Sequence, residues 1–204
     1  MRKCAELRRS AYVTHTALNN YSRGGPRWLV PRRRCRYHMI EFRTLGTIEL
    51  LRPDGTLVLS VASRSKALGL LAYLVLSEGD GARRREDVCA LLWPESDASR
   101  ARNSLNQTLH ILRSSLGNEV VTGGRETVGV QAGRIRCDAV EFRSAIAGAN
   151  WEKALELYGG DLLPGLHVTG SIEFERWLDQ QRTDLRRAAF SAARRVADQT
   201  AGDD

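Results

Sequence analysis

The four cysteines of this sequence, Cys4, Cys35, Cys89 and Cys137, lie far apart and form no CxxC motif. Cys35 and His38 could supply one pair of zinc ligands, but no second pair has the spacing of a metal site. We therefore predict no metal site. This use of cysteine fits a protein of the reducing cytoplasm.

Long apolar runs and the signatures of common enzymes are missing as well. No apolar run is long enough to span a membrane. Residues 1–38 lack the continuous apolar core of a signal peptide. There is no GxxxxGK(S/T) phosphate loop, no GxSxG motif and no HExxH motif, and the four histidines are scattered. We predict a protein that is not an enzyme, needs no cofactor and has no membrane partner.

The positive charge is unevenly distributed. The formal net charge is +7, but residues 1–38 alone hold ten Lys or Arg residues and one acid. Residues 39–136 have a net charge of +2, and residues 137–204 have a net charge of −4. The high isoelectric point therefore comes mostly from the N-terminal stretch, and alone it is no argument for a DNA-binding domain.

Residues 1–38 show no sustained periodicity and include the basic run Pro31–Arg34. One interpretation is a disordered basic arm that holds DNA phosphates non-specifically. The other is an upstream translation artefact with Met39 as the true start. We prefer the second, because patterned sequence begins directly after Met39.

Residues 83–117 predict two helices joined by a tight break. Arg85–Trp93 has apolar residues at helical spacing, and Pro94 disfavours helix in the residue before it. Ser96 or Asp97 can then cap the next helix by accepting from its free N–H groups.

The second of these helices is predicted to be amphipathic and to end at Gly117. Its apolar stripe consists of Ala98, Ala101, Leu105, Leu109, Leu112 and Leu116. The opposite face carries Arg100, Asn103, Gln107, His110 and Ser114. Arg102, Asn106 and Arg113 flank the stripe on one side.

Two interpretations of this polar face are open. Most amphipathic helices have a merely solvated polar face. However, this helix has neither Lys nor Glu between Ala98 and Leu116, although both residues form helix well. Arg, Asn and Gln can pair with base edges, so the composition favours a helix that enters a DNA groove.

Shorter elements surround the two helices. Ile40–Leu51, a Pro-Asp-Gly turn and Thr56–Val61 predict a small antiparallel sheet. Ser65–Glu78 predicts a helix buried on several sides. Short β-branched runs between Glu119 and Cys137, separated by glycine turns, predict a hairpin or small meander. Arg125, Arg134 and Arg136 lie on or beside it.

The sequence becomes helical from Asp138 onward. We predict helices over Asp138–Ala147, capped by Asp138, over Trp151–Tyr158 and over Ile172–Ala197. The pairing resembles the start of a helical repeat, although no complete second copy is present.

Several motifs together resemble the SARP-type antibiotic regulators. They are FRTLGTIEL from Phe42, the PDG turn, LLAYLVLSEG, DVCALLWPES and SRARNSLNQTLHILRSSLG. That family has an OmpR-type winged helix-turn-helix domain followed by a bacterial transcriptional activator domain of TPR-like helices. CDAVEF, ALELYGGDLLPGL and EFERWLDQQRTDLRR resemble the opening of the second domain. The resemblance covers Ile40 to about Asp198.

The resemblance implies an α+β fold with an N-terminal antiparallel sheet, three helices and a C-terminal β-hairpin wing, followed by an all-α TPR-like segment. The expected parts are an arm or mis-assigned start at residues 1–38, a winged helix-turn-helix domain at 39–136 and a partial activator domain at 137–204. The family's activator domain normally continues through further helix pairs. An exposed apolar strip or a partner is therefore expected on the last helix.

The resemblance also implies a transcription regulator that binds tandem repeats in promoter DNA and recruits RNA polymerase. A homodimer on DNA is a further expectation. Base contacts are predicted for Arg100, Asn103, Gln107 and His110. Phosphate contacts are predicted for Arg83, Arg84, Arg85, Arg102, Asn106 and Arg113, and wing contacts for Arg125 and Arg134.

Alternatives remain at several of these positions. Arg102 is as well placed for an internal ion pair as for a phosphate, and Arg83–Arg85 could be a solvated basic loop. Glu95 and Asp97 could contact RNA polymerase, but capping by Asp97 is the simpler interpretation. The alternative function is a protein-interaction adaptor that docks its partner through the helical segment and uses the winged domain structurally.

Overall fold

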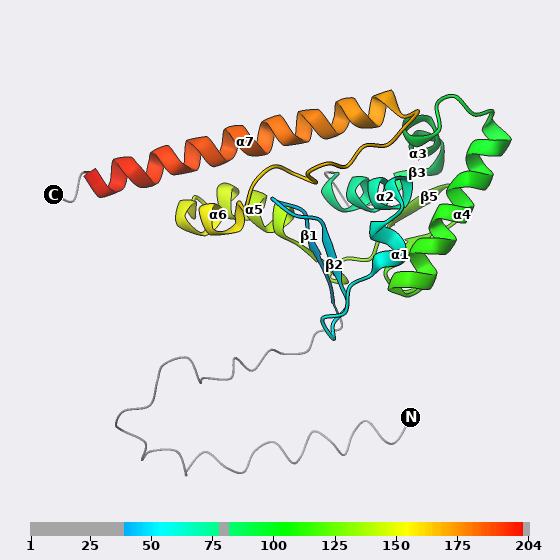
Figure 1. The fold of residues 1–204 in the computed structure, drawn as a ribbon, viewed down its shortest axis with the longest axis horizontal. Coiled ribbons are helices and arrows are strands. Elements are labelled where there is room, and N and C mark those ends of the chain that lie inside the picture. The colour runs from blue at the N-terminus through cyan, green and yellow to red at the C-terminus, as the bar shows by residue number, and fades with distance from the viewer. Residues whose placement is uncertain (1–38, 78–81, 202–204) are drawn as a thin grey trace, which may run out of the picture. The chain divides into compact units, whose positions relative to one another are not determined.

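Two small three-stranded sheets and seven helices make up the residues that the computed structural model describes, 39–77 and 82–201 (Figure 1). The predictions for residues 1–38, including the Cys35–His38 pair, lie outside these residues. The described residues belong to one compact unit. They share one hydrophobic cluster that extends across residue 136, where we predict a domain boundary. That boundary stays a prediction.

The first sheet contains the predicted antiparallel pair and one strand from much later in the chain. β1 (Ile40–Arg43) pairs with β2 (Glu49–Leu51), and Phe42 lies opposite Leu50. β6 (Ile135–Cys137) pairs parallel to the other edge of β1. Ile40 and Phe42 are buried, because alternate residues of a strand face the same side. β6 therefore does not continue a meander with the strands before it, and the meander interpretation was wrong.

The predicted strand at Thr56–Val61 was also wrong. Only Leu57 forms a bridge, to Leu51, and Leu59–Ala62 is the short helix α1. The buried residues are Val58 and Val61, three positions apart, whereas Leu57 and Leu59 are 51% and 66% exposed. A spacing of three places both valines on the core side of a helical turn.

The helix α2 (Ser65–Leu76) lies at the centre of the core. Eight of its twelve residues are buried, which agrees with its prediction as a helix buried on several sides. Gly69 lets another element approach closely: a Cβ atom at this position would lie 3.1 Å from Cζ of Phe174. Side chains from later in the chain therefore complete the surroundings of α2.

The second sheet has the strand order β3-β5-β4. β4 (Val121–Gly123) and β5 (Thr127–Val130) form an antiparallel hairpin. β3 (Ala82–Arg84) pairs with the other edge of β5. The sequence predicts the hairpin but not β3, which immediately precedes the helix α3 (Arg85–Leu92).

Three helices follow β6: α5 (Asp138–Ala147), α6 (Trp151–Leu157) and α7 (Ile172–Ala201). α7 packs against α5 and α6, and its first turns contact α3 (Figure 1). Asp138 does not cap its own helix as predicted. Its carboxylate accepts from the backbone N–H groups of Thr44 and Leu45, from the Thr44 hydroxyl and from the N–H of Ala139. The start of α5 is thereby fastened to the end of β1.

Cys137, beside this junction, should make stability fall at high pH. Burial raises the pKa of its thiol from 9.0 to about 11. The folded chain then holds this proton more tightly than the unfolded chain does. Its contribution to the free energy of unfolding is therefore fully present below pH 9 and declines as the pH rises toward 11. We expect a decline of up to ~1.4 kcal/mol per pH unit beyond that of Cys137→Ala, measured by urea unfolding at pH 8, 9 and 10. Parallel pH profiles of the two proteins would contradict this expectation.

Candidate nucleic-acid interface

The helices α3 and α4 (Ala98–Leu116) are joined by a short connection whose ends are set by local chemistry. Trp93 leaves the helical region, with φ −136° and ψ 52°, directly before Pro94. Asp97 is the N-cap of α4, and its Oδ1 accepts from the N–H of Arg100 at 2.9 Å. Gly117 ends the helix with a φ of 106°. The predicted break, the cap at Asp97 and the end of the helix at Gly117 are confirmed.

One side of α4 is anchored in the core. Its buried residues are Ala101, Leu105, Thr108, Leu109, Leu112 and Leu116. This ridge packs against α1, α2 and α3. The ridge contains the predicted apolar stripe from Ala101 onward and also Thr108, whereas Ala98 is exposed.

The other side of α4 is open. Arg100, Asn103, Gln107 and His110 are all exposed, and no part of the described chain covers them. Arg100 forms an ion pair with Asp97 at 3.2 Å, yet its side chain remains 83% exposed. A pair this exposed is weak enough to exchange partners. The four predicted base-contacting residues therefore share an accessible helix face, while the contacts themselves remain predictions.

The residues that flank the ridge make intramolecular contacts. Arg102 forms a long ion pair of 3.9 Å with Glu86, which agrees with the interpretation of Arg102 as part of an internal ion pair. Asn106 accepts a hydrogen bond from Arg85, so the two residues join α3 to α4. Arg113 is half-buried, and its Nε donates to the carbonyl of Val121 at 3.2 Å. Arg113 thus links α4 to β4, and its phosphate contact remains a prediction.

Arg83 and Arg84 lie directly before α3, and Arg84 is its N-cap. Both belong to β3, where Arg83 lies opposite Val128 and Arg84 opposite Thr127. Arg84 is exposed and Arg83 is half-buried. The two arginines are therefore part of the same small sheet as the β4–β5 hairpin, because strand pairing brings distant segments together.

The two residues predicted on the wing lie in different places. Arg125 is exposed in the turn between β4 and β5. Arg134 lies outside this hairpin, in the turn before β6, and its carbonyl accepts from the N–H of Ile40 at 2.9 Å. The wing prediction is therefore wrong for Arg134, because the chain crosses to the first sheet after β5.

The two acids between α3 and α4 are exposed. Asp97 caps α4, which is the simpler of its two interpretations. Glu95 lies close to Gly170, in the loop before α7: a Cβ atom there would be 3.6 Å from Glu95 Oε2. A polymerase contact at these acids remains a prediction.

The end of α3 is held by two residues that we did not predict as part of the site. The carbonyl of Leu92 accepts from Lys66 Nζ at 3.1 Å and from Ser171 Oγ at 2.7 Å. Lys66 also lies 5.4 Å from the centre of the Trp93 ring, and burial lowers the pKa of its ammonium group. Lys66 is the only charged residue of α2, which was the one available signal. These contacts join the α3–α4 connection to α2 and to the loop before α7.

No helix among residues 39–77 and 82–201 is long and apolar enough to cross a membrane.

No family model and no curated protein matches the chain. A solved structure of Mycobacterium tuberculosis EmbR, in complex with a low-affinity phosphopeptide, is similar in fold, with a TM-score of 0.56 and 23% sequence identity. The similarity covers 76% of this chain and 44% of the EmbR chain. The mixed α/β arrangement of small sheets and helices is thus shared, and the chain spans less than half of the EmbR chain.

Proposed function

We propose that this protein binds double-stranded DNA with sequence preference and regulates transcription. The observation that carries the proposal is the division of α4 into a buried leucine ridge and an open face of Arg100, Asn103, Gln107 and His110. An α-helix fits the major groove of B-DNA, and these side-chain types recognise base edges there. In this proposal α4 is the recognition helix of a winged helix-turn-helix.

Phosphate contacts would come from exposed cations on α4 and on the second sheet with its hairpin turn. Arg84 on β3 and Arg102 on α4 are exposed, and Arg125 is exposed at the hairpin turn. Arg102 would exchange its long contact with Glu86 for a phosphate oxygen. Such contacts position a protein on the duplex and carry little sequence information.

Activation through RNA polymerase, and binding to tandem promoter repeats, rest on the resemblance of the sequence motifs to the SARP-type regulators. The fold shared with EmbR supports the proposal at the level of architecture. The polymerase contact is assigned to the exposed Glu95, because Asp97 is occupied as the cap of α4.

The test begins with the selection of bound duplexes from a random library by the full chain. The selected duplex is then used in gel shifts at two salt concentrations. Asn103→Ala or Gln107→Ala should each weaken binding to it by about 1–3 kcal/mol and relax the preference over a scrambled duplex. Arg84→Ala should weaken binding to both duplexes equally and reduce the dependence on salt.

Gln199→Ala is the matched control, because Gln199 is exposed near the end of α7, far along the chain from α4. It should bind like the unaltered protein. Equal losses on both duplexes for Asn103→Ala, Gln107→Ala and Arg84→Ala would overturn the assignment of base contacts to α4. Failure to select any duplex would overturn DNA binding itself.

The second candidate is a protein-interaction adaptor. The observation that favours it is Phe190 on α7, which is 72% exposed on a helix otherwise rich in charge. Phe190 is a single exposed residue, and the apolar strip or partner expected on the last helix remains a prediction. The adaptor function would replace DNA binding if no duplex is selected and if the Phe190→Ala variant no longer binds a partner protein that the unaltered chain binds.

A further inference from the structure

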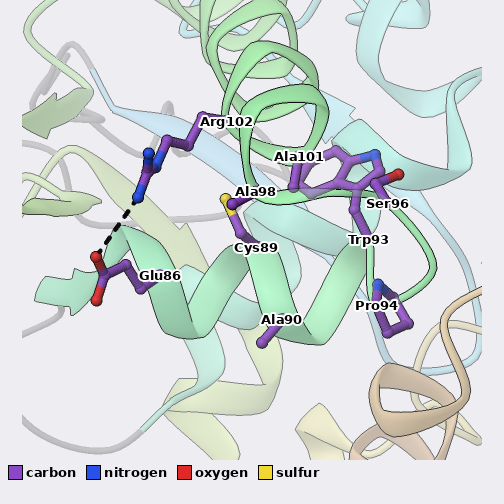
Figure 2. A pocket seen from close by; sticks show the side chains of 9 residues that line it. All are labelled: Glu86, Cys89, Ala90, Trp93, Pro94, Ser96, Ala98, Ala101 and Arg102. Carbon is purple, nitrogen blue, oxygen red and sulfur yellow. Dashed lines mark ion pairs between the residues drawn. The ribbon is translucent and has the colours of Figure 1, made fainter.

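A cavity of about 440 Å³ lies between α3 and the first turns of α4. Figure 2 shows its lining side chains, which come from both helices and from the connection between them. Its apolar lining consists of Cys89, Ala90, Trp93, Pro94, Ala98 and Ala101. Its volume is within the range of small-molecule sites, which are usually largely apolar with a few polar groups.

Small side chains on both helices leave this cavity open. Ala90 on α3 and Ala98 and Ala101 on α4 contribute only methyl groups (Figure 2). Trp93 and Cys89 are only 7% and 8% exposed, so the larger lining groups belong to the core and are fixed by it. A flat apolar ligand can therefore contact the three methyl groups and the Trp93 ring without displacing the core.

One end of the cavity is polar and has no net charge. Glu86 Oε1 and Arg102 Nη2 face each other at 3.9 Å, beyond ordinary hydrogen-bond length (Figure 2). Their side chains are 71% and 61% exposed. A group that donates to the carboxylate and accepts from the guanidinium satisfies both. For an anion or a cation, attraction to one of these side chains is offset by repulsion from the other, so the pair favours a neutral ligand.

We propose that this cavity binds a small neutral aromatic molecule that carries a carboxamide or an equivalent donor–acceptor group. The ring occupies the space bounded by the three alanines and Trp93, and the amide lies between Glu86 and Arg102. The apolar contacts supply most of the affinity, and the exposed polar pair sets the orientation. The site stands on its own geometry and does not depend on DNA binding.

Benzamide titrated into the full chain tests the site, with alanine methyl groups observed by NMR. The methyl signals of Ala90, Ala98 and Ala101 should shift and saturate together. Ala98→Leu and Ala90→Leu each place a larger side chain into the cavity from an exposed helix position, and each should weaken binding at least about tenfold. Ala193→Leu, at an exposed position on α7, is the matched control and should leave the affinity unchanged.

Arg102→Met tests the polar end separately. It should weaken benzamide about fivefold, the effect of one hydrogen bond, and leave toluene binding unchanged. The proposal is overturned if the methyl shifts grow without saturation, or if both leucine variants bind benzamide as well as Ala193→Leu does. An equal effect of Arg102→Met on benzamide and toluene would overturn the amide assignment. Thermal melting of every variant confirms that it is folded at the temperature of the titration.

Discussion

Phe174→Ala is expected to lower the free energy of unfolding by about 3–5 kcal/mol, as is usual for a fully buried aromatic residue. Phe174 is 0% exposed in the first turn of α7. Its ring lies against Gly69 of α2 and 5.3 Å from the ring of Trp177. Truncation leaves a cavity beside Gly69, which has no side chain that could fill it. The last helix is therefore part of the core that supports α2 and α3.

Urea unfolding followed by circular dichroism measures this change. Phe190→Ala is the matched control on the same helix, because Phe190 is 72% exposed. It should change the stability by no more than about 0.5 kcal/mol. Equal losses for the two variants would mean that Phe174 does not join α7 to the core. A first unfolding step confined to α7 in Phe174→Ala would instead support this role of Phe174.

The sequence predicts α4 well because its signals are local. Pro94 excludes helix before the connection, Asp97 caps the next helix, and Gly117 ends it in a conformation that favours glycine. Between these limits the leucines recur at helical steps, and the core buries them. Each signal lies within a few residues of its effect, so no knowledge of the tertiary structure is needed.

Pairing between distant segments could not be predicted in this way. β6 joins β1 across more than ninety residues, and nothing within Ile135–Cys137 specifies that partner. The error at Thr56–Val61 has a similar origin. A run this short is compatible with the two-residue period of a strand and with the 3.6-residue period of a helix. The burial of Val58 and Val61 against the rest of the core selects the helical turn.

The same distinction applies to the candidate site. Periodicity alone placed Arg100, Asn103, Gln107 and His110 on one helix face, and in the structure that face is exposed. The roles of the flanking residues depend on neighbours that the sequence does not reveal. For example, the sequence alone does not reveal that Arg113 donates a hydrogen bond to the carbonyl of Val121.

Asp138→Ala is expected to cost about 3–4 kcal/mol of stability. The Asp138 carboxylate accepts from Thr44 N–H at 2.8 and 2.9 Å, from the Thr44 hydroxyl at 2.6 Å and from Leu45 N–H at 3.0 Å. Thr44 is 0% exposed and Leu45 is 4% exposed, so water cannot readily replace the lost acceptor. A hydrogen bond to a charged group contributes about 1.5–3 kcal/mol, and each buried donor left unpaired adds a further penalty.

Two further variants separate this bonding role from a general effect of lost charge. Asp138→Asn keeps one acceptor oxygen and should show an intermediate loss, whereas Asp198→Ala removes an exposed carboxylate of α7 and should cost no more than about 0.5 kcal/mol. Urea unfolding at pH 7 ranks the three. If Asp138→Ala is as stable as Asp198→Ala, the carboxylate does not fasten α5 to β1. That result would show that the junction between the first sheet and the helical segment depends on apolar packing alone.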